Sequence, residues 1–198
     1  MTKTYTSTGR TNQKLETRKL ILRTAQTFLN KGLDFNLEDI AKEAGISRAT
    51  VYRYFSNIDI LGAEAGLDIS TKDPQDIYED LKGKEFEQKV LGIQQYYNKL
   101  AVDHEKLFRK YLSTVLNSNT SIPKRGARRK KTLKLVLDDS NFSSDEKQKL
   151  ANLLTIFMGI EPLIVTKDVC GLTNNESVEL MEWGMKLLFK GLSNLENE

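Results

Sequence analysis

Apolar side chains recur every three or four positions along most of this chain, which is the spacing of helices with one buried face. An early example is residues 14–31, and two shorter stripes follow in residues 37–44 and 48–55. The stripe of the first segment consists of Leu15, Leu22, Ala25, Phe28 and Leu29. No stretch shows a convincing alternation of apolar and polar residues, which would favour strands. The pattern therefore predicts an all-α chain.

Residues with capping preferences predict where the first helices begin and end. Gly32 suits the position just after a helix, and Asn36 with Asp39 three residues later resembles a capping box. Gly45 is expected to end the second helix after two turns, and Ser47 to cap the third. Two short helices joined by a glycine-containing turn predict a helix-turn-helix.

The third helix has an unusual outer face. Val51 and Phe55 are expected to point inward, with Ala49 as a further candidate. The side chains left outward are Arg48, Thr50, Tyr52, Arg53 and Tyr54. These hydrogen-bonding groups are of the kind that contact bases and phosphates, whereas a merely solvated helix would carry more Glu, Lys and Gln. The face therefore predicts a nucleic-acid partner.

The remainder of the chain predicts a larger helical bundle. Amphipathic segments are expected at about 58–70, 85–102, 104–118, 127–137, 145–166 and 174–191. Loops are expected around Pro74 and at residues 117–126, and residues 1–12 are predicted to form a flexible polar arm. The expected total is about nine helices. We predict a DNA-binding domain at 1–62, including the arm, and a ligand-binding and dimerisation domain at 63–198.

Charge and composition narrow the function. Residues 1–62 hold ten Lys/Arg and six Asp/Glu, a net charge of +4, whereas the rest of the chain carries −1. Cys170 and His104 are the only residues of their types, so a Cys- or His-based metal site is not expected. No nucleophile–base pair or phosphate-binding loop is recognisable, so neither enzymatic activity nor a cofactor is expected. The longest apolar stretch is cut by Glu161 and Pro162, which predicts a cytoplasmic protein without membrane association.

The segment LEDIAKEAGISRATVYRYFSN, residues 37–57, closely resembles the most recognisable part of the TetR family of bacterial transcription regulators. The first helix also resembles that family in Thr17, Arg18, Ile21, Leu22, Ala25 and Phe28. One departure is Ile58, where family members usually carry a Lys that touches a phosphate. The resemblance is dense over residues 17–62, and a weaker likeness to one branch of the family covers about 150–192.

The resemblance implies a homodimer that binds a near-palindromic double-stranded operator, most often as a repressor, and releases it when a small molecule binds. Arg48 and Thr50 would then meet base edges, while Tyr52 and Tyr54 would reach phosphates or thymine methyls. The further DNA-binding candidates are Asn36, Ser47, Arg53, Arg18, Lys14 and Arg10. The alternative is a DNA-binding regulator without a small ligand, controlled by a protein partner.

Two groups of residues are candidates for the implied dimer and effector sites. The last two helices would form the dimer interface, through Leu153, Phe157, Ile160, Trp183 and Leu187. An effector cavity would be lined by Tyr96, Tyr97, Phe108, Tyr111 and Phe157, although each of these aromatic residues is also a plausible core residue. Glu161, inside an apolar stripe, would either pair across the dimer or contact a polar ligand.

Overall fold

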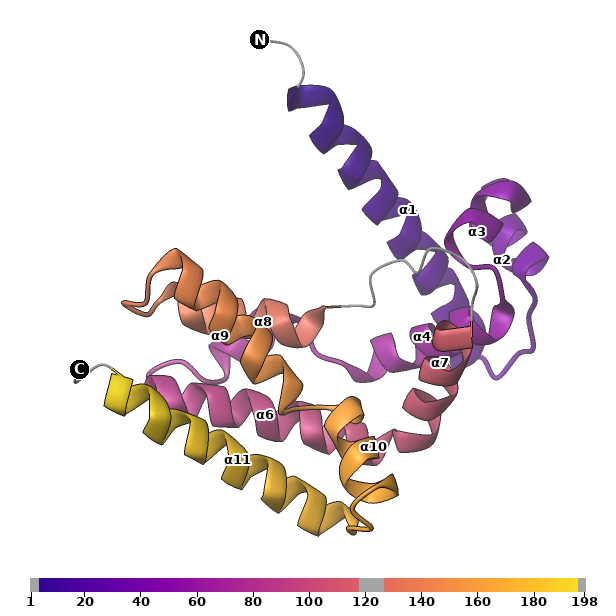
Figure 1. Cartoon of the computed structure of the whole chain (residues 1–198). Helices are drawn as coiled ribbons and strands as arrows, with labels where there is room; N and C mark the ends of the chain where they lie inside the picture. Colours follow the sequence, from indigo (N-terminus) through magenta and orange to yellow (C-terminus); the bar gives the residue numbers. More distant parts are fainter. Residues whose placement is uncertain (1–3, 118–126, 196–198) are drawn as a thin grey trace. The chain divides into compact units, whose positions relative to one another are not determined.

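The computed structural model describes residues 4–117 and 127–195, and every regular element within them is an α-helix (Figure 1). The elements are α1 (Thr4–Asn30), α2 (Leu37–Glu43), α3 (Arg48–Tyr54), α4 (Ile58–Ser70), α5 (Pro74–Glu79), α6 (Phe86–Asp103), α7 (Glu105–Asn117), α8 (Arg128–Asp138), α9 (Ser144–Ile156), α10 (Ile160–Asp168) and α11 (Asn174–Leu195). The all-α prediction is confirmed. The loop expected at 117–126 lies almost wholly outside the described residues.

The chain divides into two compact units. The first contains α1 to α4 together with α7 from Leu107 onward, and the second contains α5, α6 and α8 to α11. Compactness therefore groups the whole of α4 with the helices before it. The boundary that we predict after residue 62 concerns the division of functions and stays a prediction.

The first unit is built on a small core between α1, α2, α3 and α4. Its fully or almost fully buried members include Ile21, Ala25, Ile40, Val51, Phe55 and Leu61. Polar contacts also tie α1 to α4, because Arg18 pairs with Glu64 at 2.5 Å and the Gln26 amide donates to Asp68 Oδ2 at 2.6 Å. Ile58 begins α4 and packs against this core.

The second unit is arranged around α6, which packs against α8, α10 and α11 (Figure 1). Its buried side chains include Val90, Ile93, Leu133, Leu154, Leu163 and Met185. Gln94 of α6, only 1% exposed, donates through Nε2 to the carbonyls of Phe157 and Met181, both at 2.8 Å. This amide fixes the end of α9 and the middle of α11 to the central helix.

Three expectations about the helices are corrected. Residues 4–12 are not an arm, because α1 already begins at Thr4. A short α5 begins at Pro74, since Asp73 caps it and a proline in the first turn has no backbone donor to lose. The segment expected as one helix at 145–166 is divided into α9 and α10. The described residues therefore hold eleven helices rather than about nine.

The division between α9 and α10 is held by contacts from elsewhere in the second unit. Gly159 lies in the left-handed region, at φ 86°, and its amide donates to Asn98 Oδ1 at 2.8 Å. The Arg129 guanidinium donates to the carbonyl of Met158. Among the described residues no single helix has the length and apolarity to cross a membrane, and only the α9–α10 pair, bent by 43°, passes that test jointly.

Candidate nucleic-acid interface

The turn between α2 and α3 is fixed by its backbone. Gly45 adopts φ 64°, which lets its amide reach the carbonyl of Lys42 at 3.3 Å and lets the Ile46 amide reach Ala41 at 3.0 Å. These two bonds form a Schellman ending, for which glycine is the preferred residue because a Cβ disfavours this backbone region. Ile46 then packs on the core. The predicted turn is confirmed, and it sets the direction in which α3 leaves.

Side-chain caps start both helices of the motif. The Asn36 side chain accepts from the Asp39 amide at 3.0 Å, and Asp39 in return accepts from the Asn36 amide at 3.0 Å. Ser47 Oγ accepts from the Thr50 amide at 3.1 Å. Both predicted caps are confirmed. In each cap the side-chain oxygen accepts from a backbone amide, a donor that a phosphate oxygen could also use.

The inner face of α3 is formed by Val51 and Phe55, as predicted, with exposures of 0% and 2%. The Arg18 guanidinium covers the Phe55 ring at 4.9 Å from its centroid. Ala49 is exposed, contrary to expectation, because two residues along a helix turn its side chain about 200° away from Val51. Ala49 therefore belongs to the outer face.

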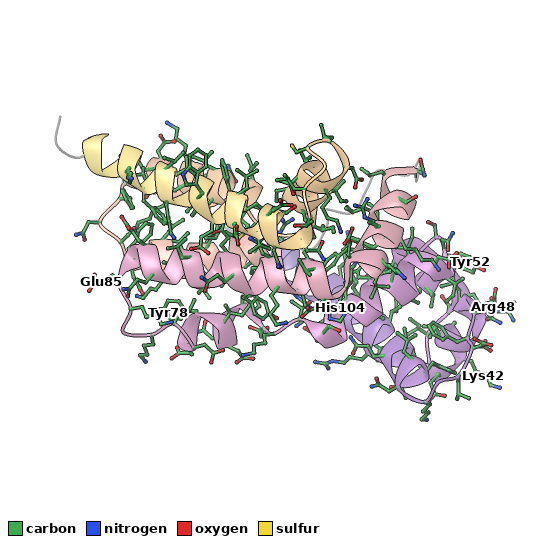
Figure 2. The ribbon with its side chains drawn as sticks, turned by 90° about the horizontal axis from the view of Figure 1, so that it is seen from below. Lys42, Arg48, Tyr52, Tyr78, Glu85 and His104 are labelled. Carbon is green, nitrogen blue, oxygen red and sulfur yellow. The ribbon has the colours of Figure 1, made fainter. Side chains whose placement is uncertain are left out.

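The outer face of α3 exposes Arg48, Ala49, Tyr52 and Arg53, while Thr50 is half-buried. Figure 2 shows Arg48 and Tyr52 at the rim of the first unit, with Lys42 of α2 near them. Arg53 lies over the Tyr54 ring at 5.5 Å, and Tyr54 packs partly against the core. The arrangement presents two guanidinium groups and one phenol on a short helix whose opposite face is anchored.

Tyr52 is held by a residue of the neighbouring helix. Its hydroxyl donates to Glu38 Oε1 in α2 at 3.0 Å. The pKa of Tyr52 is raised above its ordinary value, mainly by this hydrogen bond and further by partial desolvation. The hydroxyl therefore keeps its proton at neutral pH and donates it to Glu38.

The remaining DNA-contact candidates are not equally available. Lys14 is exposed, whereas Arg18 is engaged with Glu64 and Phe55. Arg10 lies on α1, but its side chain is outside the described part of the chain. The contacts of all these residues with DNA stay predictions.

Sequence reasoning missed Glu38 and Lys42. Lys42 is exposed in the last turn of α2. A basic residue next to the Gly45 turn is visible in the sequence, so Lys42 could have been included among the DNA-contact candidates. Glu38 is fourteen residues from Tyr52, and a contact between two crossing helices cannot be predicted from the spacing of residues in the sequence. Both residues belong to the surface that α2 and α3 present.

The predicted dimer residues differ in exposure. Leu153, Trp183 and Leu187 are 40%, 60% and 44% exposed, Phe157 is half-buried, and Ile160 is buried at 4%. Ile160 therefore packs inside its own unit and offers little surface to a partner. A hollow of about 630 Å³ lies on this face, lined by Phe157 and Trp183 among mainly apolar groups from α9, α10 and α11. Glu161 borders the hollow and pairs with Arg129 at 2.8 Å within the chain.

The predicted effector residues do not fall within one unit. Tyr96, Tyr97 and Phe157 belong to the second unit, whereas Phe108 and Tyr111 belong to the first. Tyr97 is buried, and its hydroxyl lies 3.0 Å from that of Thr132. The Tyr96 hydroxyl accepts from the Lys72 amide at 2.7 Å. Of the five, only Phe157 lines the hollow, and no group of three potential metal-ligating side chains occurs in the described residues.

Comparison with known proteins bears on the first unit. Residues 20–65 match the family profile described as bacterial regulatory proteins, tetR family. The match begins within α1, spans α2, the Gly45 turn and α3, and ends in α4. A comparison with curated proteins gave no significant match. Residues 20–65 therefore form a helix-turn-helix domain of the type found in bacterial regulatory proteins of the tetR family.

Proposed function

We propose that the chain is a repressor that binds a palindromic operator as a homodimer and leaves it when a small molecule binds the second unit. The observation that carries the proposal is the outer face of α3, where Arg48, Tyr52 and Arg53 are exposed on a helix anchored by Val51 and Phe55. A rigid helix with such side chains suits the major groove, which admits one α-helix and displays a distinct pattern for each base pair.

Within this proposal Arg48 is the principal reader of bases. It stands in the first turn of α3, the end of a recognition helix that usually reaches base edges, and it is exposed. An arginine can donate two hydrogen bonds to guanine O6 and N7, the commonest specific contact in the major groove. Lys42 and Lys14 would contact phosphates, adding affinity that salt weakens. In a homodimer two such helices would meet grooves about 34–36 Å apart.

The proposed homodimer is supported by an apolar face on the second unit. Large apolar side chains stand exposed on α9, α10 and α11 and just after α10, namely Leu153, Ile156, Val165, Val169, Leu180, Trp183 and Leu187. Isolated exposed apolar residues are ordinary, but such a cluster around a hollow marks an interaction site. A second copy of the chain is the occupant that a palindromic operator requires, because operator symmetry mirrors protein symmetry.

The proposed effector site is the hollow of the second unit. The hollow has the volume of a small-molecule site, and its lining is mainly apolar with one ion pair, Arg129–Glu161, at its border. The same exposed face also fits a protein partner, so regulation by another protein without a small ligand remains our second candidate. Thermal melting of the purified chain separates the two candidates. A rise in melting temperature with a small molecule favours an effector, whereas a rise only with a copurifying protein favours a protein partner.

Selection from random DNA tests the proposal as a whole. The purified chain is expected to enrich one inverted-repeat sequence, and light scattering of the complex is expected to give two chains for each repeat, or a multiple of two. Arg48→Ala is the matched variant, since it leaves the core of the first unit untouched. Enrichment of no sequence, or of one that Arg48→Ala binds equally well, contradicts the proposal.

A further inference from the structure

We propose that Glu38 is a positioning residue for Tyr52, and that Tyr52 consequently meets DNA through its ring, against a thymine methyl, rather than by donating its hydroxyl to a phosphate. The inference rests on the proposed operator binding and adds to it a specificity element shared by two helices. It names the base feature that this part of the surface reads.

The two side chains form one structural piece. Glu38 lies in the first turn of α2 and Tyr52 in the second turn of α3. The Tyr52 hydroxyl and Glu38 Oε1, 3.0 Å apart, join the two helices. The helices themselves are fixed relative to each other by the Gly45 turn and the shared core. Tyr52 is therefore restrained at both ends, by its backbone and by its hydroxyl.

The hydrogen bond decides what the hydroxyl can offer. A tyrosine hydroxyl has one proton, and here that proton is donated to a carboxylate. Its remaining lone pairs can only accept, as can the oxygens of a phosphate, so the two groups have no hydrogen bond to form. The negative charge of Glu38 also repels a phosphate placed beside the hydroxyl. The DNA backbone is therefore disfavoured at this point of the surface.

The ring remains available. Tyr52 is 47% exposed although its hydroxyl is occupied, so part of its aromatic surface faces outward next to Arg48 and Ala49. The thymine C5-methyl is the apolar feature that base pairs display in the major groove. A ring held at a fixed angle can contact that methyl at one position of the site, whereas a freely rotating ring pays conformational entropy for the same contact.

The competing arrangement is an exchange of partners on binding. In that case the Tyr52 hydroxyl leaves Glu38 and donates to a phosphate. Glu38 then only weakens DNA binding, because it competes with the phosphate for the hydroxyl. The two arrangements make opposite predictions for Glu38, because removing its carboxylate should weaken binding and reduce the thymine contact in the first, and should strengthen binding in the second.

The test uses the operator selected by the wild-type chain and replaces each thymine by uracil, which lacks the 5-methyl group. For the wild type, replacing one particular thymine in each half-site is expected to lower the affinity about fourfold, because this is the contribution of roughly one buried methyl group. Tyr52→Phe keeps the ring but loses the hydrogen bond that positions it, so it should bind within about threefold of the wild type and show a reduced uracil penalty, as Glu38→Ala does. Tyr52→Ala should bind much more weakly and lose the penalty at that position.

Glu38 variants separate positioning from charge. Glu38→Gln retains an oxygen that can accept from Tyr52 and should keep the uracil penalty. Glu38→Ala frees the ring and should reduce the penalty, a change that mere loss of helix stability would not produce at one base. Thermal melting of each variant confirms that the first unit remains folded.

The outcomes are distinguishable from failure of the proposed function. If the wild type selects no sequence, both proposals fall. If it does, the inference alone is overturned when Tyr52→Phe binds as weakly as Tyr52→Ala, or when Glu38→Ala keeps the full penalty. It is also overturned when Glu38→Ala binds more tightly and Tyr52→Phe cancels that gain in the double variant, because the hydroxyl then serves a phosphate.

Discussion

Burial shifts the pKa of Tyr97 in the second unit. Its side chain is 4% exposed, and burial raises the pKa of its hydroxyl to about 12, only partly offset by the hydrogen bond with Thr132. Because the folded state favours the neutral phenol, the folded chain keeps this proton at a pH where the unfolded chain has lost it. The stabilisation is complete below about pH 10 and is lost as pH rises toward 12.

We therefore expect Tyr97→Phe to flatten the alkaline loss of stability. Two pKa units correspond to about 3 kcal/mol, which is the most that the wild type can lose through Tyr97 between pH 10 and 12. At pH 7 the variant should lose only about 1 kcal/mol, since Thr132 also donates to the carbonyl of Arg128. Denaturant unfolding of both proteins at several pH values is the measurement, and identical alkaline slopes contradict the assignment.

At the residue level, the sequence predicted what depends on helical spacing alone. Val51 and Phe55 are four residues apart on one face, and both are buried. It did not predict the contact of Tyr52 with Glu38, because that contact depends on the angle at which α2 and α3 cross. The sequence suggests Arg18 as a DNA contact but does not predict that Glu64, forty-six residues later, pairs with it.

At the level of elements, caps were predictable because they are local. Asn36 and Ser47, both predicted from the sequence, cap the helices that follow them. The break between α9 and α10 was not predictable, since the apolar spacing continues through Gly159 and the groups that hold the break, Asn98 and Arg129, come from α6 and α8. Pro74 by itself predicts only a break, whereas Asp73 caps a helix that begins at this proline.

Ser47 allows its roles as a cap and as a phosphate neighbour to be separated. Ser47→Ala removes the acceptor for the Thr50 amide and should cost about 1 kcal/mol of stability. Ser47→Asp keeps an acceptor and should be about as stable as the wild type, but its charge should weaken operator binding by roughly tenfold at low salt, less as salt rises. Chemical unfolding and titrations at several salt concentrations measure both effects. Unchanged binding by Ser47→Asp places Ser47 away from the phosphates.

For the whole molecule, the apolar face of α9, α10 and α11 is the main evidence for association. Trp183, the most exposed aromatic residue of that face, is 60% exposed and lies at the edge of the hollow. A stable interface buries about 800 Å² on each partner, and buried aromatic residues usually contribute most of its energy. The assembly itself could only be inferred from sequence by resemblance, since exposed apolar periodicity resembles that of a core.

We expect Trp183→Glu to give a folded monomer. The change places a charge in the proposed interface but removes little from the core of the second unit, so cooperative unfolding should persist. Trp183→Phe is the matched control and should remain dimeric. Light scattering over a range of concentrations measures the mass, and a Trp183→Glu chain that stays dimeric assigns the interface elsewhere.

The most direct test of operator recognition is fluorescence anisotropy on the selected operator, with excess unrelated DNA, at two salt concentrations. We predict that binding survives the competitor, saturates at two chains per inverted repeat, weakens with salt and is lost in Arg48→Ala. Binding that the competitor and salt both abolish, or that Arg48→Ala retains in full, would contradict the claim that α3 reads a specific sequence.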